Sequence, residues 1–358
     1  MKKKLSRHVD PLAFNISDQD FYLEICNLVE FYYAHSPTYR SWLLFYYDVK
    51  SRHELLRMLS LGSLEAIPYL PASAFKLCDL NVVSSKNIIK TLQSSGTSTG
   101  VPSKIFLDKK TSEIMAERLR LDTTRAIGSE RRPLFIIDEE AVFKNRRSFA
   151  ARGAAIAGLL KFGKPIRFLL KNNNIDPLAL DELWSRQGEN ILLIGNTINV
   201  WKHLRPVLQE RKYDLSHATL VHGGGWKGFQ SSSVDNCSFK HELGSLANLG
   251  KSINFFGMVE QLGAVSYECS EGNFHVPSCC RYLMRSTATG LPVKDGEIGF
   301  LQVNSLLPSS YPGASVITDD LGSMMNEHSC LCGSKLPIFT YSGRIQTAEV
   351  RGCGSVNG

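Results

Sequence analysis

Short apolar runs alternate with helical stretches through the middle of the chain, and this alternation constrains the fold more than any other feature. The apolar runs lie at Leu134–Asp138, Ile166–Leu170, Ile191–Gly195, Thr219–His222 and Ile253–Phe256. Sequence with helical periodicity separates most of them, at Asp176–Arg186, Val200–Glu210 and His241–Leu249. Alternation of this kind predicts an α/β fold in which helices flank a mainly parallel sheet.

The segments on either side of this core have different patterns. Between residues 18 and 36, apolar residues recur at helical spacing and Pro37 follows, at Phe21, Ile25, Leu28, Val29 and Tyr32. This helix either packs on the main domain as ordinary core or lines a groove for an acyl tail. Residues 264–320 are richer in strands, such as Phe300–Asn304 and Ser315–Thr318. We therefore expect an N-terminal helical region (1–60), an α/β core (61–262), a strand-rich part (263–344) and a mobile C-terminal tail (345–358).

Composition narrows the classes of protein. No apolar stretch approaches the ~20 residues that cross a bilayer, so we expect no membrane span. The nine cysteines are an odd number scattered over 358 residues, which favours a reducing cytoplasm over a disulfide framework. The net charge of +7 suits anions such as nucleotides. No arginine-aromatic motif of an RNA-binding module is present, so we expect no nucleic-acid partner.

A cluster of positive charge lies at residues 144–171, where eight Lys or Arg residues occur without any Asp or Glu. Such a run is either a solvated helix face or a docking surface for an acidic partner.

A polar loop follows the expected strand Ile88–Leu92 and is the most informative motif. Five hydroxyl side chains and two glycines lie in seven residues, namely Ser94, Ser95, Gly96, Thr97, Ser98, Thr99 and Gly100. Glycine lets backbone N–H groups surround a polyanion, hydroxyls add donors, and Lys104 adds a positive charge. The loop is therefore predicted to bind the phosphates of ATP.

The pattern of this loop admits three other interpretations. Gly96–Gly100 matches the G-x-S-x-G nucleophile elbow, which requires a strand before it and a helix after it. Here Ile105–Leu107 has the pattern of a strand, so the loop is expected to close a hairpin. The G-x-x-x-x-G-K-[ST] phosphate loop is absent. A Ser/Thr-rich turn without a ligand remains the third interpretation.

With Val101-Pro102-Ser103-Lys104 added, this loop resembles the S-S-G-T-T-G-x-P-x-K loop of the adenylate-forming (acyl-CoA synthetase-like) superfamily. Ser98 replaces the usual second threonine and keeps the hydroxyl. Within the superfamily, the chain looks most like the LuxE-type acyl-protein synthetases, from about residue 15 onward. The segments that carry this similarity are Ile67–Lys76, Lys104–Asp108, His222–Lys227 and Ser310–Gly313.

The resemblance implies roles for four further segments. Gly223, Gly224 and Gly225 would lie against the adenine. Phe256-Gly257-Met258-Val259-Glu260 is similar to the Y-G-x-T-E segment, in which Phe256 would flank the adenine and Glu260 would hold Mg²⁺ on the phosphates. Val259 departs from the usual threonine and removes one hydroxyl. Asp320, in the equivalent of T-G-D-L-G, would bond the ribose hydroxyls, and Arg344, in Ser-Gly-Arg, would lie near the ribose and α-phosphate.

The same resemblance implies a departure at the C-terminus. Larger members carry a catalytic lysine on a small mobile domain beyond the arginine, whereas fourteen residues follow Arg344 here. We therefore expect that domain to be absent, with Lys104 or Lys227 taking over part of its electrostatic role.

Near that C-terminus, Cys353 lies in the context Arg351-Gly352-Cys353-Gly354. LuxE-type proteins are thought to carry the activated acyl group on such a cysteine. Nine residues from Arg344 span roughly 30 Å when extended, and Arg351 would favour the thiolate. Attack of this thiolate on an acyl-adenylate would give a thioester and AMP. The alternative is an inert cysteine in the tail.

A second group of soft ligands suggests a metal. Cys269, His275, Cys330 and Cys332 are a set of ligand types that suits tetrahedral Zn²⁺. Some phenylacetate-CoA-ligase-like relatives show a similar arrangement, which implies a structural zinc in the strand-rich part. Cys279 or Cys280 could substitute in the set, His328 lies close by in the sequence, and separate buried cysteines are the alternative.

These features together indicate a cytoplasmic, ATP- and Mg²⁺-dependent ligase of the acyl-protein synthetase type. It would activate a fatty or similar carboxylic acid as acyl-adenylate, load Cys353 and pass the acyl group to a partner reductase or carrier protein. One alternative is a ligase that delivers the acyl group directly to coenzyme A or a carrier-protein thiol. The other is a nucleotide-binding subunit without catalytic activity.

Overall fold

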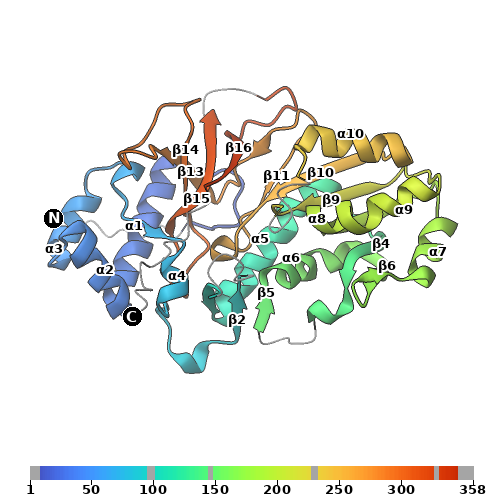
Figure 1. Cartoon of the computed structure of the whole chain (residues 1–358). Helices are drawn as coiled ribbons and strands as arrows, with labels where there is room; N and C mark the ends of the chain where they lie inside the picture. Colours follow the sequence, from blue (N-terminus) through green and yellow to red (C-terminus); the bar gives the residue numbers. More distant parts are fainter. Residues whose placement is uncertain (1–8, 95–100, 144–147, 227–232, 326–329, 346–358) are drawn as a thin grey trace, which may run out of the picture.

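The computed structural model describes residues 9–94, 101–143, 148–226, 233–325 and 330–345. Figure 1 shows three regions in a row: the N-terminal helices at one end, a strand-rich part in the middle, and a helix-flanked sheet at the other end. None of the helices within those ranges is both long and apolar enough to cross a membrane.

A seven-stranded sheet forms the largest layer, in the order β11-β10-β9-β8-β4-β6-β7. The five strands from β10 to β6 are parallel, and β11 and β7 add antiparallel edges. The strands are β4 (Arg132–Glu139), β6 (Gly163–Lys171), β7 (Asn174–Ile175), β8 (Leu192–Asn196), β9 (Thr219–Gly223), β10 (Lys251–Phe256) and β11 (Ser266–Tyr267). The predicted alternation of strands and helices is confirmed.

Helices cover both faces of this sheet, which explains why its central strands β4, β8 and β9 are buried along almost their whole length. Phe135 and Ile137 of β4 pack with α7 (Pro177–Ser185), α9 (Arg205–Glu210) and α10 (Asn236–Ala247). Leu134 and Ile136, which alternate with them, pack with α6 (Ala151–Leu159) on the opposite face. The short helix α8 (Thr197–Asn199) and a π-helical turn, η5 (Val200–Leu204), lead into α9.

A six-stranded sheet forms the strand-rich part. Its order is β12-β16-β15-β14-β13, all antiparallel, and β1 (Leu70–Pro71) pairs parallel with β15. The strands are β12 (Phe274–His275), β13 (Cys280–Arg285), β14 (Gly299–Ser305), β15 (Ser315–Met325) and β16 (Ile338–Arg344). β15 runs well past the predicted Thr318, because its later residues pair with β16.

The N-terminal helices α1 (Asp18–His35), α2 (Pro37–Tyr47) and α3 (Arg52–Leu59) share one hydrophobic core with this sheet. Ser17 caps α1 by accepting a hydrogen bond from the backbone of Asp20. Phe21, Ile25 and Val29 are buried, as their helical spacing predicts, whereas Leu28 is half-buried. The core contains residues of α1 and β14 alike, so the buried face of this helix is ordinary core.

A small three-stranded sheet, β3-β2-β5, lies between these parts. Its strands are β2 (Lys90–Gln93), β3 (Lys104–Leu107) and β5 (Ser148–Ala150). The long helix α5 (Lys109–Ile127) follows β3, and Asp108 caps its start. The short helix α4 (Ala74–Leu77) precedes β2. Short 3₁₀ turns also occur in the described residues, at η1 (Leu64–Ala66), η2 (Ser85–Asn87), η3 (Glu140–Phe143), η4 (Leu160–Phe162) and η7 (Val259–Gln261).

Candidate functional site

The predicted phosphate loop connects the two antiparallel strands of a hairpin. β2 and β3 pair from Lys90–Leu107 to Gln93–Lys104. At the end next to the loop, the backbone N–H of Ser94 donates to Ser103 O at 3.1 Å, and Ser103 N–H donates to Ser94 Oγ at 2.8 Å. The predicted hairpin is confirmed. Because a strand and not a helix follows the loop, the segment does not have the structure of a nucleophile elbow. Of the loop itself, Ser95, Gly96, Thr97, Ser98, Thr99 and Gly100 lie outside the described residues.

Lys104 lies at the stem of this loop and is paired at the surface. Its Nζ is 3.5 Å from Asp79 Oδ1, and the two side chains are 46% and 65% exposed. Lys104 therefore forms an ion pair with Asp79, which is not among the predicted site residues. Lys227, the other lysine considered, lies outside the described residues.

Glu260 is a buried carboxyl beside that stem. It lies in the 3₁₀ turn Val259–Gln261, which follows the end of β10, and only 6% of it is exposed. Burial raises its pKa, and among the groups that oppose this rise are the Ser103 hydroxyl, the Arg344 guanidinium and the Lys76 ammonium. Glu260 is thus a buried carboxyl group near one hydroxyl and two cations.

Lys76 is a charged neighbour of Glu260 that is not among the predicted site residues. It lies on α4 and is half-buried, and its charge lowers the pKa of Glu260. The sequence signal was its place in the segment Ile67–Lys76, which resembles the LuxE-type proteins, although nothing in that segment pointed to Glu260.

Asp320 and Arg344 face each other across two adjacent strands. They are register partners in the β15–β16 pair, and Arg344 Nε lies 3.3 Å from Asp320 Oδ1. Asp320 is buried, and its backbone N–H donates to Thr318 Oγ1 at 3.1 Å. The strand pairing therefore brings together two residues that are 24 positions apart, and the charge of Arg344 also lowers the pKa of Glu260, against the rise that burial causes.

Phe256 joins the two large sheets at this point. It is the last residue of β10, and its ring lies 5.2 Å from the ring of Phe339 and 5.7 Å from that of Tyr341. Both partners are on β16, the strand that ends at Arg344. The aromatic contact fixes the carboxyl end of the parallel sheet against β16, which is the edge where open α/β sheets bind ligands.

The three glycines at the end of β9, Gly223 to Gly225, differ in the structural reason for a glycine at each position. A Cβ on Gly223 would lie 2.7 Å from the backbone oxygen of Phe255, so close packing requires glycine there. Gly224 has φ of +87°, which disfavours other residues, and a Cβ on Gly225 would meet nothing within 4 Å. Gly257 likewise tolerates a Cβ at ordinary contact distance from Val265.

The four predicted soft ligands come together in space. The ligand atoms of Cys269, His275, Cys330 and Cys332 all lie within 4.8 Å of one another. Cys269 Sγ is 3.7 Å from Cys330 Sγ, and His275 Nε2 is 3.2 Å from Cys332 Sγ. His275 Nδ1 lies 3.1 Å from Leu336 O, which holds the other ring nitrogen toward the thiols.

Two tight turns present these thiols. In one, Gly272 N–H donates to Cys269 O at 3.1 Å, and in the other Gly333 N–H donates to Cys330 O at 2.9 Å. Both glycines have positive φ, near +77° and +84°. Cys280, the first residue of β13, and Cys279 just before it are buried and are not part of the cluster. His328 and Cys353 lie outside the described residues.

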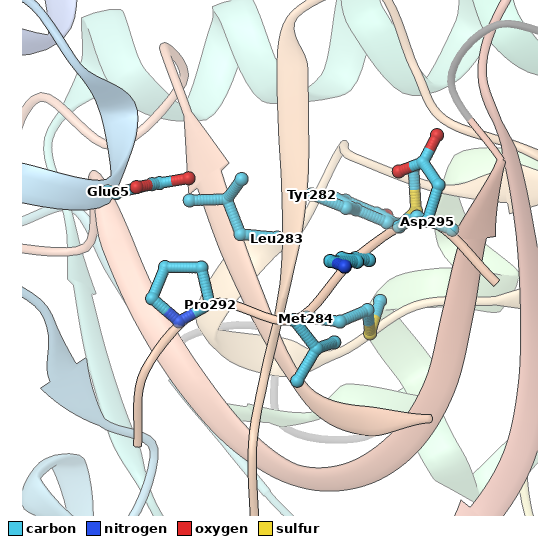
Figure 2. A pocket seen from close by; sticks show the side chains of 9 residues that line it. Glu65, Tyr282, Leu283, Met284, Pro292 and Asp295 are labelled. Carbon is cyan, nitrogen blue, oxygen red and sulfur yellow. The ribbon is translucent and has the colours of Figure 1, made fainter. Parts of the chain in front are cut away.

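A separate cavity of about 140 Å³ lies in the strand-rich part and is lined by Glu65, Tyr282, Leu283, Met284, Pro292, Val293, Lys294, Asp295 and Met324. Figure 2 shows side chains from β13 and from residues 292–295 around it. None of the residues predicted for the functional site lines this cavity, so it is distinct from the candidate site.

The fold matches that of adenylate-forming ligases. The structure of 2-hydroxyisobutyryl-CoA ligase in the post-adenylation state with 2-HIB-AMP superposes with a TM-score of 0.67 at 16% identity, covering 92% of this chain and 68% of that one. An open conformation of the same ligase with 2-HIB-AMP and CoA gives 0.65, covering 91% and 74%. The predicted α/β fold class of adenylate-forming enzymes is confirmed.

Sequence comparison gives the family. Residues 5–357 match the family described as acyl-protein synthetase, LuxE. The chain is 25% identical over 371 residues to the long-chain-fatty-acid–luciferin-component ligase of Aliivibrio fischeri, covering 97% of this chain and 93% of that protein. The protein of the same name from Vibrio harveyi is 25% identical over 307 residues, covering 81% and 77%. The chain belongs to the LuxE family of acyl-protein synthetases, and it is an ATP-dependent, AMP-forming acyl ligase.

Proposed function

We propose that this protein activates a long-chain fatty acid or a similar carboxylic acid with ATP, loads the acyl group on Cys353 and passes it to a partner protein. The two curated relatives are named as ligases of long-chain fatty acids and a luciferin component, which supports this substrate and a reductase or carrier as acceptor. The observation that carries the proposal is that Glu260 lies near Ser103, at the stem of the phosphate loop, and near Arg344, which pairs with Asp320 at 3.3 Å. A reducing cytoplasm would keep the thiols reduced.

The first step joins two anions, and the site suits that task. A carboxylate oxygen of the acid attacks the α-phosphorus, a new P–O bond forms, and the bond to the bridging oxygen breaks as pyrophosphate leaves. Backbone and hydroxyl donors of the loop would hold the β- and γ-phosphates, and Arg344 would stabilise charge at the α-phosphate. Lys104 or Lys76 would supply further positive charge near the phosphates.

Glu260 is proposed to hold Mg²⁺. The residue fits this role because Mg²⁺ prefers carboxylate oxygen, and because a divalent cation would favour the ionised form that burial disfavours. When bound, the ion would neutralise charge on the phosphates.

The second step moves the acyl group to sulfur. The thiol of Cys353 loses its proton to solvent, the thiolate attacks the acyl carbonyl, a C–S bond forms, and the C–O bond to AMP breaks. The cysteine would then deliver its thioester to the acceptor.

Asp320 is proposed to bond the ribose hydroxyls, with Phe256 and Gly223–Gly225 beside the adenine. Replacing Asp320 by Asn keeps the shape but weakens the hydrogen bonds to ribose and removes the ion pair with Arg344. We expect Asp320→Asn to raise KM for ATP roughly tenfold, because hydrogen bonds to charged groups contribute about 1.5–3 kcal/mol. A steady-state titration of ATP at saturating acid measures this effect. An unchanged KM would remove Asp320 from the nucleotide site.

A structural zinc ion is proposed at Cys269, His275, Cys330 and Cys332. Tetrahedral ligands about 2.3 Å from a zinc ion lie roughly 3.8 Å from one another. The separation of 3.7 Å between the sulfurs of Cys269 and Cys330 fits this geometry. The ion would clamp the β11–β12 segment to the β15–β16 connection, and so support the strand that carries Arg344.

A panel of carboxylic acids identifies the substrate. Purified protein is incubated with ATP, Mg²⁺ and acids of different chain length, and AMP formation is followed. The proposal expects AMP that depends on the acid and is largest for one class of chain length. Absence of AMP across the panel, with cell extract added as a source of partner, would leave only the nucleotide-binding subunit.

A further inference from the structure

The connection between β14 and β15, residues 306–314, is a buried loop. All of its residues are buried except Ser309, which is half-buried. Connecting loops usually run over the surface, because a buried loop must satisfy its backbone polar groups inside the protein. The loop 306–314 does so through hydrogen bonds to segments far away in the sequence, and these hydrogen bonds connect two parts of the candidate site.

One set of bonds ties the loop to the elements that carry the phosphate loop. Ser310 Oγ donates to the backbone oxygen of Phe106 on β3 at 2.7 Å, and Val82 N–H donates to Ser310 O at 3.0 Å. Ser309 Oγ lies 2.7 Å from Thr111 Oγ1 at the start of α5. The loop is thereby fixed to the strand that begins with Lys104.

Another set ties the same loop to Glu260. The Tyr311 hydroxyl donates to the backbone oxygen of Glu260 at 2.7 Å, and Gln261 Nε2 donates to the backbone oxygen of Gly313. Tyr311 is fully buried, and burial raises the pKa of its hydroxyl well above the ordinary value, as does the nearby charge of Glu260, so it stays a donor. The ring leaves no room for a side chain at position 313, because a Cβ there would lie 2.3 Å from Tyr311 Cε2.

Glu260 needs this support because of its local structure. It lies in a single 3₁₀ turn of three residues rather than in a helix or a strand with a ladder of bonds. A hydrogen bond to its own backbone oxygen fixes the position of its Cα, and from there the position of the carboxylate.

We propose that Tyr311 is a positioning residue, which holds Glu260 at the correct distance from the phosphate-loop hairpin through the buried loop 306–314. The inference rests on the proposed role of Glu260 as the Mg²⁺ ligand. It makes Tyr311 responsible for how well Mg²⁺ promotes nucleotide binding, without any contact between Tyr311 and the nucleotide.

The test compares Tyr311→Phe with Tyr282→Phe. Tyr282 is also buried, and its hydroxyl lies 3.1 Å from Ser266 Oγ, so its substitution removes a buried hydroxyl contact elsewhere. The affinity for α,β-methylene-ATP is measured by calorimetry with Mg²⁺ and again with EDTA, and the ratio of the two affinities is the readout. Glu260→Gln is measured in parallel, as is the Mg²⁺ dependence of AMP formation.

We expect Tyr311→Phe to lower this ratio about three- to tenfold, as the loss of one hydrogen bond allows. Tyr282→Phe should leave the ratio unchanged, although both variants melt at somewhat lower temperature. A wild-type ratio in Tyr311→Phe, or an equal fall in Tyr282→Phe, would overturn the inference. If Glu260→Gln keeps the wild-type ratio, Glu260 is not the ligand and the inference is wrong with it. If the wild type binds with Mg²⁺ but forms no AMP, the proposed reaction fails while the binding ratio still tests Tyr311.

Discussion

Glu260→Gln is expected to lower the rate of acid-dependent AMP formation by about 10²–10³, the range seen when a group that stabilises charge in the transition state is removed. Gln has almost the same shape as Glu but cannot ionise, so it would bind Mg²⁺ poorly. The measurement is the initial rate of AMP formation at saturating ATP and acid. A rate within a few fold of the wild type would remove Glu260 from the catalytic site.

The same substitution should leave the protein at least as stable. Burial raises the pKa of Glu260 in the folded state, so the folded protein holds this proton more tightly than the unfolded chain does. Ionised Glu260 therefore costs stability above the ordinary pKa of about 4.5, and this cost disappears as the pH falls toward that value. We expect Glu260→Gln to melt at an equal or higher temperature at pH 7, with the difference shrinking toward pH 5.

A matched control is available in Glu268, another buried carboxylate. Glu268 Oε1 lies 2.6 Å from Lys240 Nζ and also accepts a hydrogen bond from Asn236, so its charge is compensated. Glu268→Gln should lower the melting temperature, because it removes a charge-assisted contact of a buried carboxylate with Lys240, and the folded variant should keep its activity. A large loss of stability in Glu260→Gln would mean that this carboxylate supports the fold rather than the site.

Zinc removal is the second large effect we expect. The purified protein should contain one zinc ion per chain by mass spectrometry, and Cys330→Ser should lose it. A structural metal contributes several kcal/mol to folding, so the loss should lower the melting temperature by on the order of 10 °C. Cys237→Ser is the control, because Cys237 is exposed and lies outside the cluster.

Two different results would contradict the proposed zinc site or its structural role. Protein produced in zinc-supplemented medium that contains no metal, and a Cys330→Ser variant with wild-type stability, would leave the four residues as an ordinary cluster of thiols and one imidazole. Loss of zinc without any change in stability would keep the site but contradict its structural role.

The sequence predicted the regular parts of the fold because their cause is local. Apolar runs and helical periodicity located the strands of the parallel sheet, and the hydroxyl-rich loop between two short apolar runs predicted the β2–β3 hairpin. Helix ends were less predictable: α10 begins at Asn236 rather than His241, because Asp235 caps it by accepting a hydrogen bond from Ser238. That cap lies in a polar segment without apolar periodicity.

The candidate site could not be predicted from local sequence patterns alone. Glu260, Asp320 and Arg344 were singled out through a family resemblance, and their approach depends on the β15–β16 register and on the contact of Phe256 with β16. The bond from Tyr311 to Glu260 joins residues 51 positions apart, and no periodicity signals such a pair. The pairing of Lys104 with Asp79 was missed for the same reason.

The central claim is that acid activation leads to an acyl group on Cys353, and one labelling experiment tests it most directly. Wild type and Cys353→Ser are incubated with ATP, Mg²⁺ and the radiolabelled acid that gives the most AMP, and label on the protein is measured before and after hydroxylamine. We predict hydroxylamine-labile label on the wild type, none on Cys353→Ser, and a first turnover of acyl-adenylate in both. Equal label on both proteins, or AMP formation without label on either, would contradict the account and favour direct transfer to coenzyme A or a carrier thiol.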